Sequence, residues 1–476
     1  MQKKIVFALA ALAATAILPF SVFADTNTDI SNQTNTAQNQ ITQTTQSTVT
    51  IPPLLQHIYD AKQMLQNVEL DDTIVPLIKT IKRKKVQVGY MLSTKDAALA
   101  IWDPAANQID IVKGTLSATK FNFTANPNIT VKQNAFNGVN TNFTVEQPVG
   151  GVVLALKYLL SNPDSGNKAN IEAGLQPIVY VPYSPDLSTQ EIADAGAAYL
   201  DKVMDTVVFQ LNQIQSASVP GEKLTDAIKP SIIKALIYAE HTSGTDFNDP
   251  NSMQDLINRL NILFATNQDQ TFGYSVSSGG ARGIAQFIPS TYLGVVQRHP
   301  YANLISDPII GLNDQINSIK AEYLLIDDYI AAVHARIADA FNPAYSYDYG
   351  AAAYNGGVSR VAKAVETFGD SWNVDPSAQT ATLQAQINGE QEIVKTLKNQ
   401  IAATKDLGQK SDLKNQLANE SSTLSNLKSE LSSIKTTALR KETIFYLNKM
   451  HLLIQVLNGQ NSSTTAAAPP PANPGA

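Results

Sequence analysis

The chain has 476 residues, of which 43% are hydrophobic, and its net charge is −6 at pH 7. This length allows about two to four domains with real cores, and the acidic balance disfavours a nucleic-acid-binding or anionic-membrane-binding protein. The absence of cysteine excludes disulfides, thiolate metal sites and lipid attachment at an N-terminal cysteine.

The first 50 residues have the pattern of a secretion signal followed by a flexible leader. Two lysines precede an apolar stretch at residues 5–20, and Val-Phe-Ala at residues 22–24 offers the small residues that a signal peptidase reads. The apolar stretch is too short for a good membrane span. We therefore predict a signal peptide over residues 1–24, a disordered polar leader over residues 25–50, and a periplasmic protein with no lipid or transmembrane anchor.

An α+β accessory domain is predicted over residues 51–218. Its helices are expected at residues 54–68 and 189–215. Short strands are expected at residues 86–92, 109–114, 121–124 and 142–146. The basic run KTIKRKK at residues 79–85 is predicted to be a solvated helix end, with an anionic partner as the alternative. No catalytic pattern occurs in this region, so we expect it to have a binding or positioning role.

Glu240 stands at the end of an apolar helix, in the segment SIIKALIYAEHTSG at residues 231–244. The isoleucines and leucine before it keep helical spacing, which predicts one buried face. A carboxylate there lies beside the negative end of the helix dipole and next to a packed core, and both effects raise its pKa. Glu240 is therefore a candidate proton donor at neutral pH. For this segment alone, a solvated glutamate at a helix end is the simpler interpretation.

Two further segments place polar residues in unusual surroundings. In SGGARGIAQFIPSTY at residues 278–292, glycines allow tight turns before a helix expected from residues 284–288, and Gln286 lies among apolar neighbours. No strand precedes these glycines and no lysine follows them, which argues against a phosphate loop. In YDYGAAAYNGG, Tyr354 and Asn355 stand at a predicted helix end, where a helix C-cap is the alternative to a cleft.

The most regular pattern lies at residues 377–437, which we predict to be an antiparallel helical hairpin. Leucine and isoleucine recur at alternating spacings of four and three on both sides of a breaker at residues 406–412. If the chain folds about Gly408, Glu390 and Glu420 each face a leucine of the other helix. These two glutamates could fix the register or contact a partner, although side chains bent out to solvent are the simpler interpretation.

Taken together and in this order, the segments resemble the Slt-type lytic transglycosylases, lysozyme-like enzymes that cleave the glycan strands of bacterial peptidoglycan. That family has a helix ending in Glu-Ser, then Gly-x-x-Gly-Leu-Met-Gln-x-x-Pro, then Ala-Tyr-Asn. The counterparts here are Glu240, the segment GARGIAQFIP that begins at Gly280, and the Ala-Tyr-Asn that ends at Asn355. A fourth family pattern, Glu-Thr followed by a tyrosine, is matched by Glu442 and the TIFY that follows it.

This resemblance covers about residues 221–368 and 440–457 and implies a mainly α fold. The expected architecture is a lysozyme-like helical catalytic domain with the helical hairpin inserted in it and the α+β region before it. The remaining predicted boundaries are 219–376 for the catalytic domain, 377–437 for the inserted hairpin, 438–458 for a C-terminal helix that completes the catalytic domain, and 459–476 for a disordered Pro/Ala tail.

The resemblance also implies that Glu240 acts first as an acid and then as a base. It would protonate the oxygen that links N-acetylmuramic acid to N-acetylglucosamine, while the acetamido oxygen of the substrate stabilises the anomeric carbon. Glu240 would then deprotonate the C6 hydroxyl, which closes a 1,6-anhydro ring. By the same matching, Gln286 and Asn355 bind the sugars and Tyr354 orients Glu240 or the acetamido group. Glu442 is a further substrate contact, and no metal or cofactor is implied.

Two departures from the family pattern surround Glu240. His241 replaces the usual serine, and about thirty residues at 247–276 are inserted before the glycine motif. Two alternative functions stay open: a goose-type lysozyme that releases reducing ends by attack of water, and a non-catalytic, glycan-binding scaffold of an envelope-spanning secretion or conjugation apparatus. Besides peptidoglycan, a protein partner is expected at residues 51–218, at the hairpin or at the Pro-rich tail, and no nucleic acid is expected.

Overall fold

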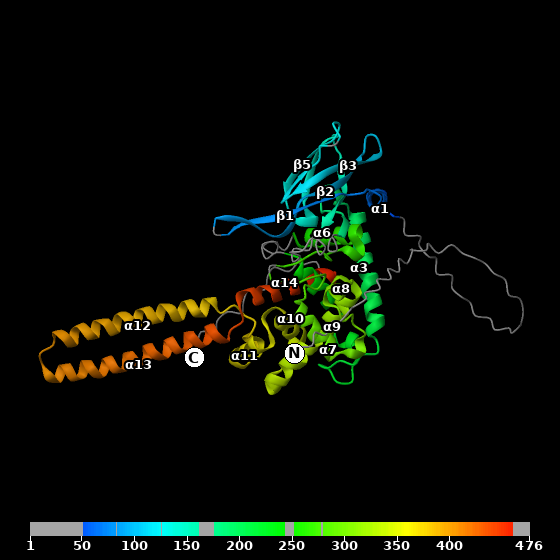
Figure 1. Cartoon of the computed structure of the whole chain (residues 1–476). Helices are drawn as coiled ribbons and strands as arrows, with labels where there is room; N and C mark the ends of the chain where they lie inside the picture. Colours follow the sequence, from blue (N-terminus) through cyan, green and yellow to red (C-terminus); the bar gives the residue numbers. More distant parts are fainter. Residues whose placement is uncertain are drawn as a thin grey trace, which may run out of the picture. The chain divides into compact units, whose positions relative to one another are not determined.

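The computed structural model describes residues 51–81, 83–124, 126–160, 176–242, 252–277 and 279–459. The predicted signal peptide, the polar leader and all but the first residue of the predicted tail lie outside these ranges. Within them the chain is mainly helical, with antiparallel sheets between residues 72 and 180 (Figure 1). The predicted mainly α class with an α+β N-terminal region is confirmed. No described helix is both long enough and apolar enough to cross a bilayer.

The N-terminal region consists of a helix and two antiparallel sheets. The helix α1 spans Pro53–Gln66, and the strands span Asp72–Ile81 (β1), Lys84–Asp103 (β2), Gln108–Ser117 (β3), Lys120–Asn122 (β4), Thr130–Ala135 (β5), Asn142–Gln147 (β6), Val152–Leu160 (β7) and Gln176–Tyr180 (β8). The larger sheet has the order β4-β3-β2-β7-β8 with β1 on β2, and the smaller sheet pairs β5 with β6. Buried Leu55 and Ile58 of α1 share a core with Ala98 and Leu154 of the larger sheet.

Most of the expected elements of this region are present. The helix predicted at residues 54–68 is α1, and the strands predicted at 86–92, 109–114 and 142–146 lie within β2, β3 and β6. Only the first two residues of the strand predicted at 121–124 are extended in β4. The strand β7 has no strand signal in the sequence, because its run VVLALKYLL is apolar at nearly every position. Consecutive buried residues such as Ala155 and Leu156 lack the alternation that marks a half-buried strand.

The prediction of a helix end at residues 79–85 is wrong. Residues 79–81 end β1 and residues 84–85 begin β2; Ile81 pairs with Lys84, and Arg83 before β2 adopts a positive φ of 65°. Isoleucine, valine and threonine precede the basic residues, and these β-branched residues favour strands over helices. The basic residues therefore lie at the tip of a β-hairpin.

The helical part of the chain is organised around one buried helix, α9 (Gln315–Ile337), whose residues from Ile319 to Asp327 are all buried. The helix α3 (Gln190–Leu211), which the sequence analysis placed in the N-terminal region, contributes Leu200 and Val207 to the same core. The other helices are α4 (Leu224–Ala227), α5 (Pro230–Glu240), α6 (Met253–Asn267), α7 (Pro289–Arg298), α8 (Pro308–Asn313), α10 (Ser346–Gly356), α11 (Val358–Phe368) and α14 (Lys441–Leu457).

The inserted segment at residues 247–276 contains α6, which joins the helical part to the N-terminal region. The side chain of Asn267 donates to the carbonyl of Val181 and accepts from its amide, at 2.9 and 2.8 Å. Lys62 of α1 donates to the carbonyl of Thr266 at 3.1 Å. At Gly196 of α3 the two helices α3 and α6 approach so closely that a Cβ atom would lie 1.7 Å from a backbone oxygen of α6. This part of the insert therefore serves as packed structure.

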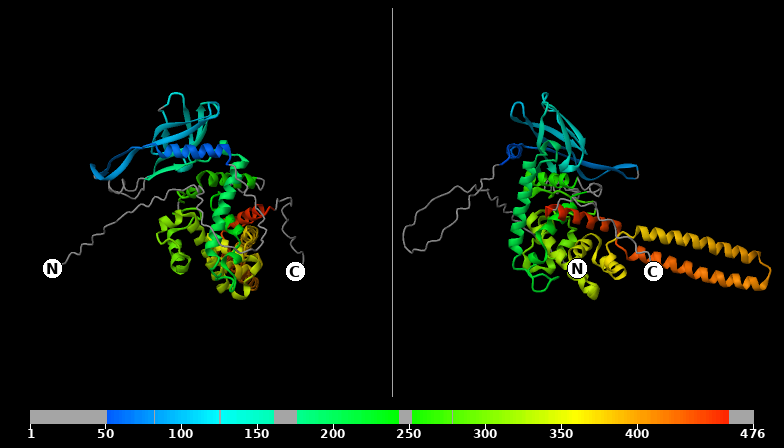
Figure 2. Two further views of the ribbon diagram at one scale, coloured as in Figure 1. Left: turned by 90° about the vertical axis from the view of Figure 1, so that its right-hand side faces the viewer. Right: turned by 180° about the vertical axis from the view of Figure 1, so that it is seen from behind.

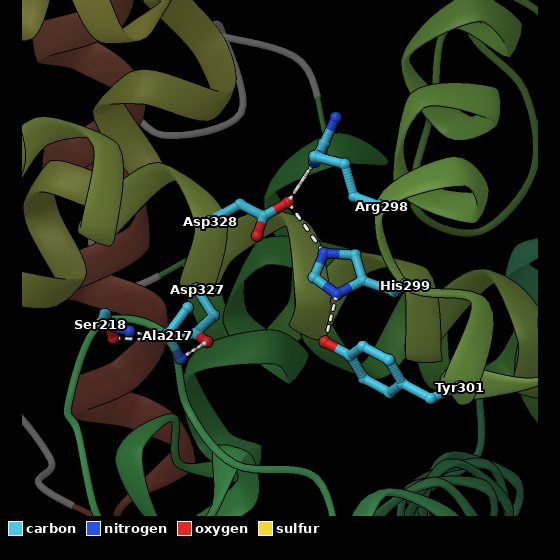
Figure 3. A network of polar contacts seen from close by, with 7 residues as sticks. All are labelled: Ala217, Ser218, Arg298, His299, Tyr301, Asp327 and Asp328. Atoms are coloured by element: carbon cyan, nitrogen blue, oxygen red, sulfur yellow. Dashed lines mark hydrogen bonds and ion pairs between the residues drawn. The ribbon is translucent and has the colours of Figure 1, made fainter.

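Two consecutive aspartates fix α9 to different segments (Figure 3). Asp327 accepts hydrogen bonds from the amides of Ala217 and Ser218, at 2.6 and 3.1 Å. Asp328 accepts from His299 at 3.0 Å and forms an ion pair with Arg298 at 2.7 Å. Because Arg298 ends α7, these contacts hold the core helix against the helix that follows the glycine motif.

The predicted helical hairpin is present as α12 (Ser377–Ala403) and α13 (Leu407–Thr437), which lie side by side in Figure 1. The predicted turn at Gly408 is wrong, because Asp406 caps α13 by accepting from the amide of Gln409 at 2.8 Å. The earlier turn shifts the register, so Glu390 meets Glu420 instead of a leucine. A hydrogen bond between these two side chains raises the pKa of Glu390.

Candidate active site

Glu240 is the last residue of α5, and contacts with the core and with α14 hold this helix end in place. The preceding residues Ile233, Leu236 and Ile237 are fully buried, so the end of the helix is fixed in the core. The ammonium group of Lys449, on α14, donates to the carbonyls of Ala239 and Thr242, the second at 2.7 Å. A cation at these carbonyls satisfies acceptors that have no partner within the helix and complements the helix dipole.

The carboxyl group of Glu240 accepts a hydrogen bond from the phenol of Tyr446, with 2.7 Å between Oη and Oε1. Burial raises the pKa of Glu240, while the hydrogen bond from Tyr446 and the charge of Lys449 act in the opposite direction. The predicted rise of this pKa therefore agrees with the structure, and burial is its main cause. A carboxyl group in such surroundings keeps its proton at higher pH than a solvated one, as a general acid requires.

A cavity of about 480 Å³ opens beside Glu240 and is also lined by His241, Thr242 and Gln286. Its volume falls in the range typical of small-ligand sites. Glu240 is the only carboxylate among the described residues that line it. Nowhere in the described part of the chain do three histidine, aspartate or glutamate side chains lie close enough together to hold a metal ion.

Gln286 reaches this cavity from a tight turn, and the helix predicted from residues 284–288 is absent. Arg282 and Phe287 exchange two backbone hydrogen bonds at 2.9 and 3.1 Å, and α7 begins only at Pro289. Gly283 and Gln286 both adopt positive φ, at 73° and 48°. The side-chain amide of Gln286 donates to the carbonyl of Gly283 at 2.8 Å, which holds Gln286 at the cavity wall.

His241 links the end of α5 to this turn. Its ring stacks on Phe272 with 3.5 Å between ring centres, and Nε2 lies 2.7 Å from the carbonyl oxygen of Ile284. Because a carbonyl oxygen only accepts, Nε2 carries the proton. Burial lowers the pKa of His241 to about 4. His241 is therefore neutral at pH 7 and serves as a lining and positioning group.

Tyr354 and Asn355 come close to this site without lining the cavity. The phenol of Tyr354 donates to the carbonyl of Ala285, the residue before Gln286. Burial raises the pKa of Tyr354 well above its ordinary value, and the charge of Glu240 adds to this effect. The side-chain oxygen of Asn355 accepts from Thr443 of α14 at 2.8 Å. Together these two residues connect α10 to the segments that carry Gln286 and Tyr446.

Glu442, the fifth residue singled out in the sequence, lies at the start of α14 and does not line the cavity. Its side chain is 65% exposed and pairs with Arg440 at 3.1 Å. The residue of this motif that reaches Glu240 is Tyr446, four positions further along the helix. The fourth motif therefore reaches Glu240 through its tyrosine, and the substrate contact predicted for Glu442 stays a prediction.

A second part of the cavity wall, the asparagine wall, comes from the N-terminal region, and nothing in the sequence indicated this. Asn137, Asn140 and Asn142 line the cavity from the connection between β5 and β6 and from the start of β6. Buried Thr141 fixes this connection, because its hydroxyl donates to the carbonyl of Gly138 at 2.7 Å and accepts from the amide of Asn137 at 3.1 Å. Amide side chains offer both donors and acceptors, so this wall suits a ligand rich in hydroxyl and amide groups.

Two larger side chains complete this wall. Tyr183 follows β8, and Arg259 belongs to α6. The guanidinium carbon of Arg259 lies 5.9 Å from the ring centre of Tyr183, within the range of a cation–π contact. The cavity is thus formed jointly by the N-terminal region, the inserted helix and the segments that carry the family motifs.

A second carboxyl group, that of Glu322 on α9, lies near Glu240 but is fully buried. Neither of its oxygens has a hydrogen-bond partner among the described residues. Burial raises the pKa of Glu322 well above its ordinary value, and the charge of Glu240 raises it further. Glu322 therefore keeps its proton to higher pH than a solvated glutamate does.

Replacement of Glu322 by methionine is expected to stabilise the protein at pH 7 by about 1–3 kcal/mol, because it removes an unpartnered polar group from the core. The raised pKa means that the folded state binds the proton more tightly than the unfolded state does. Stability therefore falls as pH rises above 4.5, and the gain from methionine grows with pH. Urea unfolding at pH 4 and pH 7 measures this. The exposed Glu366→Met is the control, and a loss of stability in Glu322→Met at pH 7 contradicts the expectation.

Comparison with known proteins found no matching family model, no matching curated protein and no matching solved structure. An assignment of function therefore depends on the residues and contacts of this chain.

Proposed function

We propose that this protein cleaves the glycan strands of peptidoglycan as a lytic transglycosylase, with residues 219–376 and α14 forming a lysozyme-like unit. The observation that carries the proposal is that the four sequence motifs contact one another beside Glu240. Tyr446 donates to Glu240, His241 lies against Ile284, and Tyr354 donates to Ala285. These segments come from widely separated parts of the chain. The apolar N-terminal segment fits secretion into the periplasm, where peptidoglycan lies.

In this proposal Glu240 performs both proton transfers. Its raised pKa favours the protonated form, which donates to the glycosidic oxygen; the resulting carboxylate then takes the proton of the C6 hydroxyl. Hydrolysis by two carboxylates would need a partner about 5–10 Å from the acid. The carboxylate of Asp348 is hydrogen-bonded to His451 at 2.7 Å and does not line the cavity. Glu322 is buried in the core, so the described cavity supports a mechanism with one carboxylate.

Tyr446 has a defined role in this mechanism, because its phenol stabilises the ionised form of Glu240. Replacement of Tyr446 by phenylalanine is expected to raise the pKa of Glu240 and to lower the cleavage rate about tenfold, the usual contribution of one hydrogen bond to a charged group. Cleavage needs protonated Glu240, so activity is lost as pH rises through this pKa. The alkaline limb of the pH–rate profile should therefore move to higher pH.

The control for this variant is Tyr345→Phe, which changes a phenol that packs against Trp372 and does not line the cavity. Its pH–rate profile should match that of the wild type. A Tyr446→Phe profile with an unmoved or lowered alkaline limb contradicts the role assigned to the phenol.

The residues of the asparagine wall are expected to bind the hydroxyl and acetamido groups of the sugars. In a Glu240→Gln background, the Asn137→Ala, Asn140→Ala, Asn142→Ala triple variant should bind a peptidoglycan tetrasaccharide about tenfold to a hundredfold more weakly. Calorimetric titration measures this affinity. The exposed Asn128→Ala should leave it unchanged, and an unchanged affinity in the triple variant contradicts the assignment.

Lysis of purified sacculi embedded in a gel tests the proposed activity. Wild-type protein should clear the gel, and the Glu240→Gln variant should not. If neither protein clears it, while both bind sacculi, the scaffold alternative is correct. If both proteins clear it equally, another residue is the acid.

A further inference from the structure

The β1–β2 hairpin extends beyond the sheet to which it belongs. In the described strands β1 pairs only with β2, whereas β2 pairs with β3 from Lys95 onward and with β7 from Ala97 onward. Residues 84–94 of β2 therefore pair with β1 alone. The blue ribbon in Figures 1 and 2 leaves the other strands in every view. A two-stranded ribbon is only marginally stable in water by itself. Contacts with a partner would stabilise this segment.

The tip of this ribbon combines exposed apolar side chains with cations. Ile78, Ile81 and Val86 are 50%, 49% and 41% exposed. Around them lie four exposed cations, Lys79, Arg83, Lys84 and Lys85. No acidic residue occurs between Asp72 and Asp96. The tip is thus strongly basic, although the net charge of the whole chain is −6. Because charges more than roughly 10 Å away are largely screened at ordinary salt, the acidic residues elsewhere do not cancel this local charge.

The register shows that this combination occurs on both faces of the ribbon. Paired residues of antiparallel strands lie on the same face, and successive residues alternate between faces. The pairs Ile78–Gln87 and Thr80–Lys85 therefore share one face, and the pairs Lys79–Val86 and Ile81–Lys84 share the other. A protein docked on one face would contact half of these groups. A lipid interface surrounds an inserted tip on all sides and contacts them all.

We propose that the β1–β2 tip binds the surface of a bilayer that contains anionic phospholipid. Ile78, Ile81 and Val86 enter the boundary between headgroups and acyl chains, and the surrounding lysines and Arg83 bind lipid phosphates, as basic amphipathic elements do at membrane interfaces. This inference does not depend on the cavity beside Glu240. It gives the N-terminal region a second role, as a membrane contact for the full chain.

Because the chain has no cysteine, a single introduced cysteine can report on the tip alone. Thr80 is exposed and lies between the two isoleucines. Thr80→Cys in the full chain, labelled with an NBD fluorophore, should show a blue-shifted and stronger emission on vesicles of phosphatidylcholine and phosphatidylglycerol. It should show neither change on phosphatidylcholine alone. Ser425→Cys, exposed on α13, should show no change on either vesicle.

Charge and apolar variants separate the two parts of the proposal. Changing Lys79, Arg83, Lys84 and Lys85 to glutamine should weaken vesicle binding about fivefold per charge. The matched control changes four exposed lysines of the α12–α13 hairpin to glutamine and should bind vesicles as the wild type does. These lysines are Lys398, Lys405, Lys414 and Lys428. The Ile78→Ser, Ile81→Ser double variant should lose the blue shift on anionic vesicles.

Three results overturn the proposal. The first is an absent or equal response of the Thr80 probe on anionic and neutral vesicles. The second is unchanged binding in the glutamine variant. The third is the same blue shift with soluble polyphosphate in place of vesicles, which would identify an anionic polymer as the ligand.

Discussion

Replacement of Glu240 by glutamine is expected to reduce glycan cleavage by about two to four orders of magnitude, the usual contribution of a general acid and base. The amide keeps the shape of the side chain and the contact with Tyr446 but cannot donate the proton. Burial raises the pKa of Glu240, so the folded state binds its proton more tightly than the unfolded state does. The ionised carboxylate then destabilises the fold at neutral pH, and Glu240→Gln should also melt at a higher temperature there.

The melting-temperature gain should shrink as pH falls through 4.5, because below that pH the glutamate is protonated in the unfolded state as well as in the folded state. Initial rates on sacculi and thermal unfolding from pH 4 to pH 8 measure the two effects. The exposed Glu430→Gln is the matched control and should change neither. A Glu240→Gln protein that keeps the wild-type rate contradicts the assignment of the acid, and one that unfolds at a lower temperature at pH 7 contradicts the effect of burial.

Replacement of Gly283 by alanine is expected to destabilise the fold by about 2–5 kcal/mol. Gly283 has φ of 73°, which costs an L-residue roughly 1–2 kcal/mol. An added Cβ would also lie 2.1 Å from the carbonyl oxygen of Leu312, and such overpacking costs about 1–3 kcal/mol. The turn that holds Gln286 must then shift, so glycan cleavage should fall as well.

Gly280→Ala is the matched control for this turn. Gly280 also has positive φ, at 83°, but nothing lies within 4 Å of an added Cβ. Gly280→Ala should therefore lose only the stability that positive φ costs an alanine. Urea unfolding measures both variants, and equal stability of Gly283→Ala and Gly280→Ala would contradict the close approach to Leu312.

The elements that could be predicted from the sequence are those with a local signal. The helix before Glu240 has an apolar face of helical spacing, and the hairpin of α12 and α13 repeats its leucines regularly. The raised pKa of Glu240 followed from its place at a helix end beside apolar residues. Gln286 was identified by its apolar neighbours, although the turn that carries it was taken for a helix.

The features that were missed depend on contacts between distant segments. Nothing near Asn137 indicates that its loop faces Glu240, because α6 and Asn267 bring the two regions together. The only local sign that Glu322 is buried is the run of mostly apolar residues around it on α9. The hairpin register failed by a few residues because Asp406, not Gly408, determines where α13 begins.

The central claim is that Glu240 cleaves glycan without water as the nucleophile, and the mass of the products tests it most directly. Purified sacculi would be digested with the wild-type protein, and the soluble muropeptides analysed by mass spectrometry. We predict 1,6-anhydro products that are one water lighter than those of a hydrolase, and none from Glu240→Gln. Products with reducing ends, or the same products from both proteins, would contradict the claim.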